Sequence, residues 1–129
     1  MTAAGYSGTP LPRKLGVRDG SRVLLVAAPA GFTLEADYHV RAGKHPYDVL
    51  LVFCPDTAAL RRRWPSAAPR TVERGALWIA WPKRASGVPT DLTEDGVRAH
   101  ALPLGWVDVK VCAVDEVWSG LKLVRRLKL

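Results

Sequence analysis

YDVLLVFC at residues 47–54 is an unbroken apolar run after its first two residues, and it decides the fold. Two further runs share this pattern, RVLLVAA at 22–28 and ALWIAW at 76–81. Strands that are apolar on both faces are typical of parallel sheets, because other chain segments then cover them from both sides. The three runs therefore predict three neighbouring parallel strands in the centre of one sheet.

Helices are expected between these strands, because a parallel connection needs a crossover of about a dozen residues. Asp56 offers an N-cap to a helix that carries Trp64 on its apolar face, and Pro65 and Pro69 are expected to end that helix. Asp91 is expected to cap a second helix, with Glu94 reaching back from position N3. Both helices would pack on the sheet.

The C-terminal part of the chain predicts a hairpin. WVDVKVCAV at 106–114 alternates apolar and polar residues, as a half-covered strand near a sheet edge does. WSGLKLVRR at 118–126 is the next extended candidate, and the short link between the two favours antiparallel pairing. The apolar residues at 121–127 would also suit a short helix.

Together these elements predict an α/β fold, namely a three-layer sandwich with a mainly parallel central sheet and a C-terminal antiparallel edge hairpin, in a truncated Rossmann-like arrangement. A chain of 129 residues has about the size of one domain. Residues 1–21 have room for one helical turn at 11–15 and are expected to be a leader packing on the domain at 22–129. Residues 38–41 could form a further short strand.

The composition is that of an ordinary globular protein, with 48% apolar and 24% charged residues. No apolar run approaches the roughly 18 residues of a membrane span, and the N-terminus does not resemble a signal peptide, so a cytoplasmic protein without membrane contact is predicted.

Cys54 and Cys112 lie inside apolar runs and are expected to be buried. Their spacing matches no zinc motif and His39, His45 and His100 are scattered, so neither a metal site nor a cofactor is predicted.

The net charge of +7 would attract nucleic acids and other anions. The candidate phosphate contacts are the arginines at 61–63 and the tail LKLVRRLKL at 121–129. Trp64, Trp78 and Trp81 lie in apolar sequence and are expected to fill the core rather than to stack on bases. Nucleic-acid binding is therefore kept as an alternative function.

The loop after the third run is the strongest candidate for a ligand site, because ligands of open α/β sheets bind beyond the carboxyl ends of the strands. It combines two cations, a hydroxyl and a glycine with the start of the expected second helix, whose N-terminus favours a phosphate or carboxylate. The turn at 29–32 would form the opposite wall. Alternatively, the prolines at 82 and 89 only stiffen a connection, the carboxylate caps a helix and the cations are solvated. The predicted ligand-binding residues are Lys83, Arg84, Ser86, Gly87, Asp91 and Gly31.

No catalytic group is identifiable, because catalysis needs a nucleophile beside a base or two carboxylates in different environments. Ser7, Ser86 and Ser119 lack the sequence context of a nucleophile elbow. The chain is interpreted as a non-catalytic or degenerate domain that binds a small anionic ligand or a protein partner. Homodimerisation through residues 106–126 is a further hypothesis, since an alternating edge strand invites pairing.

Two family resemblances add to this interpretation. The layout of AAPAGF at 27–32, YDVLLVFC, a helix, GALWIAW at 75–81, a helix and a hairpin resembles the later part of an S-adenosylmethionine-dependent methyltransferase. This resemblance implies a methyltransferase-like enzyme as another alternative. The turn after the first run departs from that family, which has a glycine-rich turn there, because Gly31 is its single glycine.

The second resemblance covers most of the chain. The stretches YSGTPLPRKLG at 6–16, WPKRASGVPTDLTED at 81–95 and VDVKVCAVDEVWSGLKLVRR at 107–126 resemble a family of short actinobacterial proteins classified as a domain of unknown function. This resemblance implies a bacterial cytoplasmic protein and assigns neither an activity nor catalytic residues.

Overall fold

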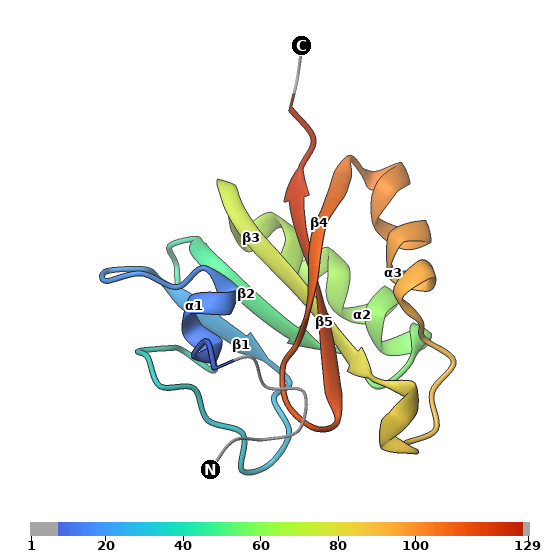
Figure 1. The fold of residues 1–129 in the computed structure, drawn as a ribbon. Coiled ribbons are helices and arrows are strands. Elements are labelled where there is room, and N and C mark those ends of the chain that lie inside the picture. The colour runs from blue at the N-terminus through green and yellow to red at the C-terminus, as the bar shows by residue number, and fades with distance from the viewer. Residues whose placement is uncertain (1–7, 128–129) are drawn as a thin grey trace.

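The computed structural model describes residues 8–127, and in it the three apolar runs form adjacent parallel strands. The strands form one five-stranded sheet with the order β1-β2-β3-β5-β4, drawn as a ribbon in Figure 1. Ser7 and the outer ends of the predicted leader and tail lie outside the described residues. The strands are β1 (Val23–Val26), β2 (Tyr47–Phe53), β3 (Thr71–Pro82), β4 (Trp106–Ala113) and β5 (Trp118–Arg125), the helices are α1 (Leu11–Leu15), α2 (Thr57–Ala67) and α3 (Glu94–Ala101), and 3-10 turns span Ala68–Arg70, Arg84–Ser86 and Leu102–Leu104.

Rows of apolar side chains hold the parallel half of the sheet in register. Leu24 lies opposite Leu50, and Leu50 lies opposite Leu77. All three are at most 2% exposed, as expected for strands covered on both sides. The prediction of three neighbouring parallel strands is therefore confirmed. The run at 76–81 is the buried end of a longer strand that begins at Thr71.

The sheet as a whole is mixed, which corrects the prediction of a mainly parallel one. Two strand pairings are parallel, β1 with β2 and β2 with β3, and two are antiparallel, β3 with β5 and β4 with β5. The cause is the hairpin: its second strand, β5, joins the sheet next to β3 and leaves β4 at the edge. The hairpin itself is formed as predicted, and the short-helix alternative at 121–127 is wrong.

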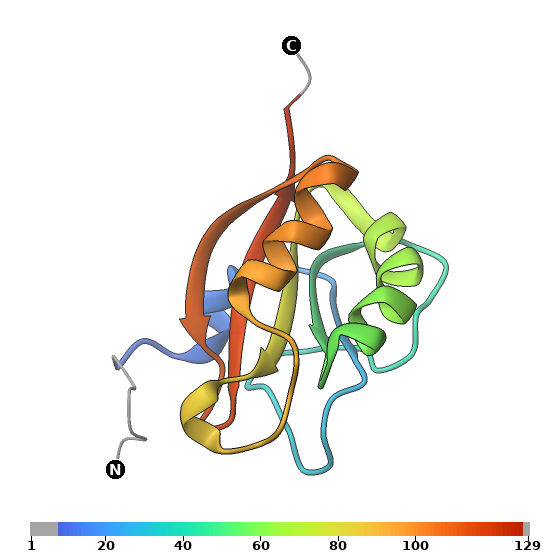
Figure 2. The same ribbon diagram turned by 90° about the vertical axis from the view of Figure 1, so that its right-hand side faces the viewer.

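The two faces of the sheet are covered differently. α2 and α3 cover one face, which we call the helix face, as Figure 2 shows. The opposite face, which we call the loop face, is covered by α1 and by irregular chain from residues 28–38. A Rossmann-like arrangement with full helical layers on both faces is therefore not seen. None of the described helices is long and apolar enough to cross a membrane.

The connection from β1 to β2 forms no helix, because prolines and glycines interrupt it. It runs instead past the outer edge of β1, where His39 makes a single parallel bridge with Leu24. The His39 amide donates to the Val23 carbonyl at 2.8 Å, and the Leu25 amide donates to the His39 carbonyl at 2.9 Å. The short strand predicted at 38–41 is thus reduced to one bridge.

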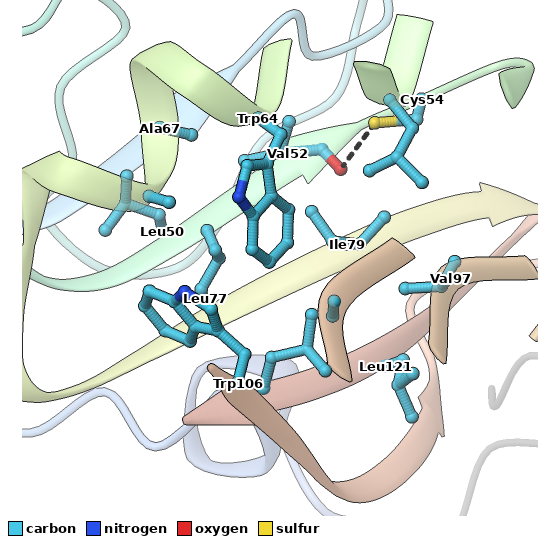
Figure 3. Packing of buried hydrophobic residues seen from close by; sticks show 14 of the residues in the cluster. Leu50, Val52, Cys54, Trp64, Ala67, Leu77, Ile79, Val97, Trp106 and Leu121 are labelled. Carbon is cyan, nitrogen blue, oxygen red and sulfur yellow. Dashed lines mark hydrogen bonds between the residues drawn. The ribbon is translucent and has the colours of Figure 1, made fainter. Parts of the chain in front are cut away.

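The core on the helix face is built around two tryptophans. Trp64 of α2 and Trp106 of β4 meet edge to face with ring centres 5.6 Å apart, above Leu77 and Ile79 of β3 (Figure 3). Pro65 does not end α2, because the helix continues to Ala67, whereas Pro69, the other proline expected to end it, lies in the 3-10 turn that follows the helix. Pro65 is exposed, so the backbone carbonyl that lacks its amide partner can be solvated.

The core on the loop face reaches into the N-terminal segment. Trp78 is fully buried, and its indole Nε1 donates to the Leu15 carbonyl at 3.0 Å. Leu15, also fully buried, packs with Leu25 and Phe53. Residues 11–15 therefore do more than lie on the surface of the domain, because α1 closes the core over this part of the sheet.

Candidate anion-binding site

A hollow of about 490 Å³ lies beyond the carboxyl end of β3, and we call it the β3-end hollow. Its floor is apolar, since Trp81 and Leu92 belong to the core on the helix face. Its polar lining residues are Lys83, Arg84, Thr90, Thr93, Glu94 and Ser119. The hollow thus lies where the sequence places the ligand loop.

The loop is shaped by a tight turn immediately after the strand. The Lys83 amide donates to the Val117 carbonyl at 2.8 Å, which ties the end of β3 to the β4–β5 link. A 3-10 turn follows, and Gly87 ends it with a φ of 77°, a left-handed conformation that favours glycine. The Ser86 hydroxyl donates to the Lys83 carbonyl at 2.7 Å and accepts from the Val88 amide at 3.1 Å.

Two positive charges at the rim of the hollow lack an acidic partner. Neither Lys83 nor Arg84 makes an ion pair within residues 8–127. The acid of the lining, Glu94, is paired with Arg98, which also binds Asp108 at 2.7 Å. Because Arg98 already neutralises Glu94, the rim keeps a positive field that favours an anion.

Asp91 has a different role from the predicted one. Its carboxylate accepts a hydrogen bond from the Thr57 amide at 2.8 Å, at the start of α2, and this bond lowers the pKa of Asp91. α3 is capped by Thr93, whose Oγ1 accepts from the Gly96 amide at 3.0 Å. The predicted capping box at 91–94 is therefore wrong. An unpaired amide of α2, distant in sequence, provides the partner for Asp91.

Gly31 does not form the opposite wall of the β3-end hollow. It lines a second hollow together with Phe32 and Trp118, and both aromatic rings pack with the core on the loop face. The β3-end hollow lies on the helix face, so the sheet separates the two. The structure thus brings Lys83, Arg84 and Gly87 together, while Ser86, Asp91 and Gly31 do not line the hollow.

Ser119 is one of the lining residues that the site prediction misses. It lies opposite Trp81 in the β3–β5 register, and its hydroxyl makes no hydrogen bond within residues 8–127. The hydroxyls of Thr90 and Thr93 are already engaged, because they accept the Leu92 and Gly96 amides. Only the pairing of β5 with β3 brings Ser119 to the hollow, and no local pattern in the sequence marks it.

The thiols and imidazoles do not contribute to this hollow, since no cysteine or histidine lines it. Cys54 is fully buried, and burial raises its pKa to about 12. Its Sγ lies 3.9 Å from the Val52 carbonyl oxygen, as Figure 3 shows. Cys112 is half-buried, and burial also raises its pKa. Within residues 8–127, no group of three or more histidines, cysteines or acids is placed to hold a metal ion.

Several of the predicted phosphate contacts serve the fold instead. Arg63 donates to the Phe53 carbonyl at the end of β2. Arg125 donates to three backbone carbonyls near the start of β3 and lies 4.6 Å from the ring centre of Trp106. Arg126 donates to the Leu102 carbonyl at 3.1 Å.

The prediction that three tryptophans fill the core is confirmed, because Trp64, Trp78 and Trp81 are each at most 6% exposed.

No protein-family model, curated protein or solved structure matches this chain. Both family resemblances therefore remain predictions.

Proposed function

We propose that the protein is a non-catalytic binding module for a small anionic ligand, which occupies the β3-end hollow. The observation that carries this proposal is the pair of rim cations, Lys83 and Arg84, without an ion-pair partner among the described residues. Ser119 adds a hydroxyl that can donate to the same anion.

The chemistry of the hollow indicates what kind of anion fits. Arg84 can bind a phosphate or carboxylate through two parallel hydrogen bonds, while Lys83 acts as a point charge. Trp81 and Leu92 provide an apolar floor. The volume of about 490 Å³ falls within the range of about 300 to 1,000 Å³ that is typical of small-molecule sites. A phosphorylated or carboxylated metabolite with a small apolar part combines these features.

The test is a thermal-shift screen with inorganic phosphate, pyrophosphate, nucleotides and dicarboxylates. A ligand that binds only the native state raises the melting temperature, and at one hundred times its Kd it adds about 2.7 kcal/mol of stability. We expect a shift with the wild-type chain that is lost in the Lys83→Ala/Arg84→Ala double variant. An Arg61→Ala/Arg62→Ala variant removes the same charge from α2, outside the hollow, and is expected to keep the shift.

The proposal fails if no anion shifts the melting temperature of the wild-type chain, or if both double variants respond alike. S-adenosylmethionine belongs in the same screen because of the methyltransferase-like alternative. A shift with this compound that persists in the Lys83→Ala/Arg84→Ala variant would favour that alternative over the binding module.

A further inference from the structure

A second positive surface lies on the loop face of the hairpin, away from the β3-end hollow. Lys110 of β4 and Lys122 of β5 are direct cross-strand partners. Leu121 and Leu123 are buried in the core on the helix face, so alternation along β5 places Lys122 on the loop face. Like charges directly opposite each other destabilise a sheet, which makes this pair unfavourable for the fold itself.

A third cation reaches this pair from the N-terminal segment. Trp78 lies opposite Lys122 in the β3–β5 register, and the Leu15 carbonyl of α1 accepts its indole hydrogen bond. Lys14 Nζ donates to the Ala113 carbonyl at the end of β4, so hydrogen bonds tie α1 to β3 and to the end of β4. Arg18 follows α1 in the chain, and its positive charge acts on Lys122. We call Arg18, Lys110 and Lys122 the loop-face cationic cluster.

The electrostatics of Lys122 agree with the cross-strand placement of Lys110. Burial lowers the pKa of Lys122, and the positive charges of Lys110 and Arg18 lower it further. All three ion pairs found within residues 8–127 belong to Arg98, and none involves the cluster. The acid of β4, Asp108, is held by Arg98 on the helix face. None of the three cations of the cluster therefore makes an ion pair within residues 8–127.

The surroundings of the cluster are open and extended. Val107 and Val124, which are direct cross-strand partners next to it, are only half-buried. Figure 1 shows no helix in front of the upper parts of β4 and β5, whereas α1 lies over the β1–β2 half of the sheet. An open face carrying several unpaired cations fits a ligand with many closely spaced negative charges. Duplex DNA carries one such charge for about every 1.7 Å of its axis.

We propose that the loop-face cationic cluster binds the phosphate backbone of a nucleic acid without reading its base sequence. Trp78, the aromatic residue nearest in register, is fully buried and therefore does not stack on bases. The three cations supply charge and ammonium or guanidinium donors, which contact phosphates irrespective of sequence. This site is independent of the proposed function, because none of its residues lines the β3-end hollow.

The test measures binding of the full chain to a fluorescently labelled 20-base-pair DNA by anisotropy at several salt concentrations. Each phosphate contact contributes about −0.9 to the slope of log affinity against log salt, so three contacts give about −3. In the Lys110→Gln/Lys122→Gln variant we expect a loss of at least tenfold in affinity at low salt and a slope smaller by about two. Arg18→Gln, in an exposed turn, is expected to reduce the slope by about one.

The matched control is Arg61→Gln/Arg62→Gln, which removes the same charge from the opposite side of the molecule and is expected to keep the wild-type slope. An equal loss in both double variants would show that only the net charge attracts DNA, and a loss confined to the control would move the site to α2. Absence of binding at low salt, or equal affinity for inorganic tripolyphosphate, would also overturn the proposal. Unchanged circular dichroism of each variant ensures that lost binding is not lost folding.

Discussion

The helix face and the loop face of the same sheet differ in how they are closed and in how their charges are balanced. On the helix face, α2 and α3 cover the strands, and Arg98 binds Glu94, Asp95 and Asp108. On the loop face, α1 and irregular chain cover only part of the sheet. There, Lys110 and Lys122 lie opposite each other without an acid.

This difference follows from the residues of the strands themselves. β2 is buried along nearly its whole length and therefore needs cover on both faces. β4 and β5 carry lysines among their apolar residues, so one of their faces can remain in water. The uncovered part of the sheet is therefore where the chain can keep charges that do not serve the fold. Four predictions break or sharpen this comparison.

The largest effect is expected from removing Trp78, the buried residue of β3 that α1 covers on the loop face. Trp78→Ala deletes a fully buried ring and the hydrogen bond to the Leu15 carbonyl. A loss of about 3 to 5 kcal/mol in the free energy of unfolding is expected, measured by urea denaturation. Trp118→Ala, at a half-buried position, serves as the comparison and should cost less. A loss below about 1 kcal/mol for Trp78→Ala would mean that α1 contributes little to closing this face.

A smaller, pH-dependent loss is expected on the helix face at His100. Its ring lies edge-on to Trp64 at 5.0 Å between ring centres, and its buried Nε2 has no hydrogen-bond partner among the described residues. Burial lowers the pKa of His100 below its ordinary value of 6.5, and the charge of Arg61 adds to this shift. As the pH falls through 6.5, the unfolded chain takes up a proton that the native state resists, so stability declines until the pH lies below the native pKa.

The check is urea unfolding of the wild-type chain and of His100→Phe at pH 7.5 and pH 5. The phenylalanine keeps a ring against Trp64 but takes up no proton, so the difference in stability between the two pH values should shrink in the variant. His39 and His45, which are exposed, remain in both chains as an internal control. An unchanged difference in the variant would assign the pH dependence to other groups.

The ion pairs of the helix face are expected to make a small, salt-dependent contribution to the free energy of unfolding. Arg98→Met keeps the aliphatic part of the side chain but breaks the link from α3 to Asp108. The side chain of Arg98 is 29% exposed, so each pair is partly screened by solvent and the loss should shrink in 1 M salt. Arg62→Met, at an exposed position without an ion pair in residues 8–127, should leave stability unchanged.

The smallest effect is a gain in stability on the loop face. Lys110→Glu converts the cross-strand pair with Lys122 from repulsive to attractive and should add about 0.5 kcal/mol at low salt. The same substitution should weaken binding to DNA, because it neutralises part of the cluster. Lys83→Glu, in the loop after β3, has no such partner and serves as the control. A destabilised Lys110→Glu variant would show that the two lysines do not repel each other in the native state.

The parts of the candidate site that were predictable are those encoded by neighbouring residues. Lys83, Arg84 and Gly87 follow directly after a buried strand, so their place at its carboxyl end follows from the run before them. Asp91 and Ser119 were not predictable in this way. Asp91 is three residues from a plausible helix start, yet it accepts the Thr57 amide at the start of α2, and Ser119 enters the hollow through β5.

The sequence by itself determined which segments are buried strands and that three tryptophans belong to the core, and it favoured the hairpin of residues 106–126 over a short helix. These features depend on the period of apolar residues along a short segment, which the residues display directly. Only the tertiary structure decided that β5 inserts beside β3, that one face lacks a full helical layer, and that Lys110 and Lys122 lie opposite each other. The physical reason is that strand order and face coverage depend on contacts between residues far apart in the chain, and local periodicity carries no information about which distant partner is met.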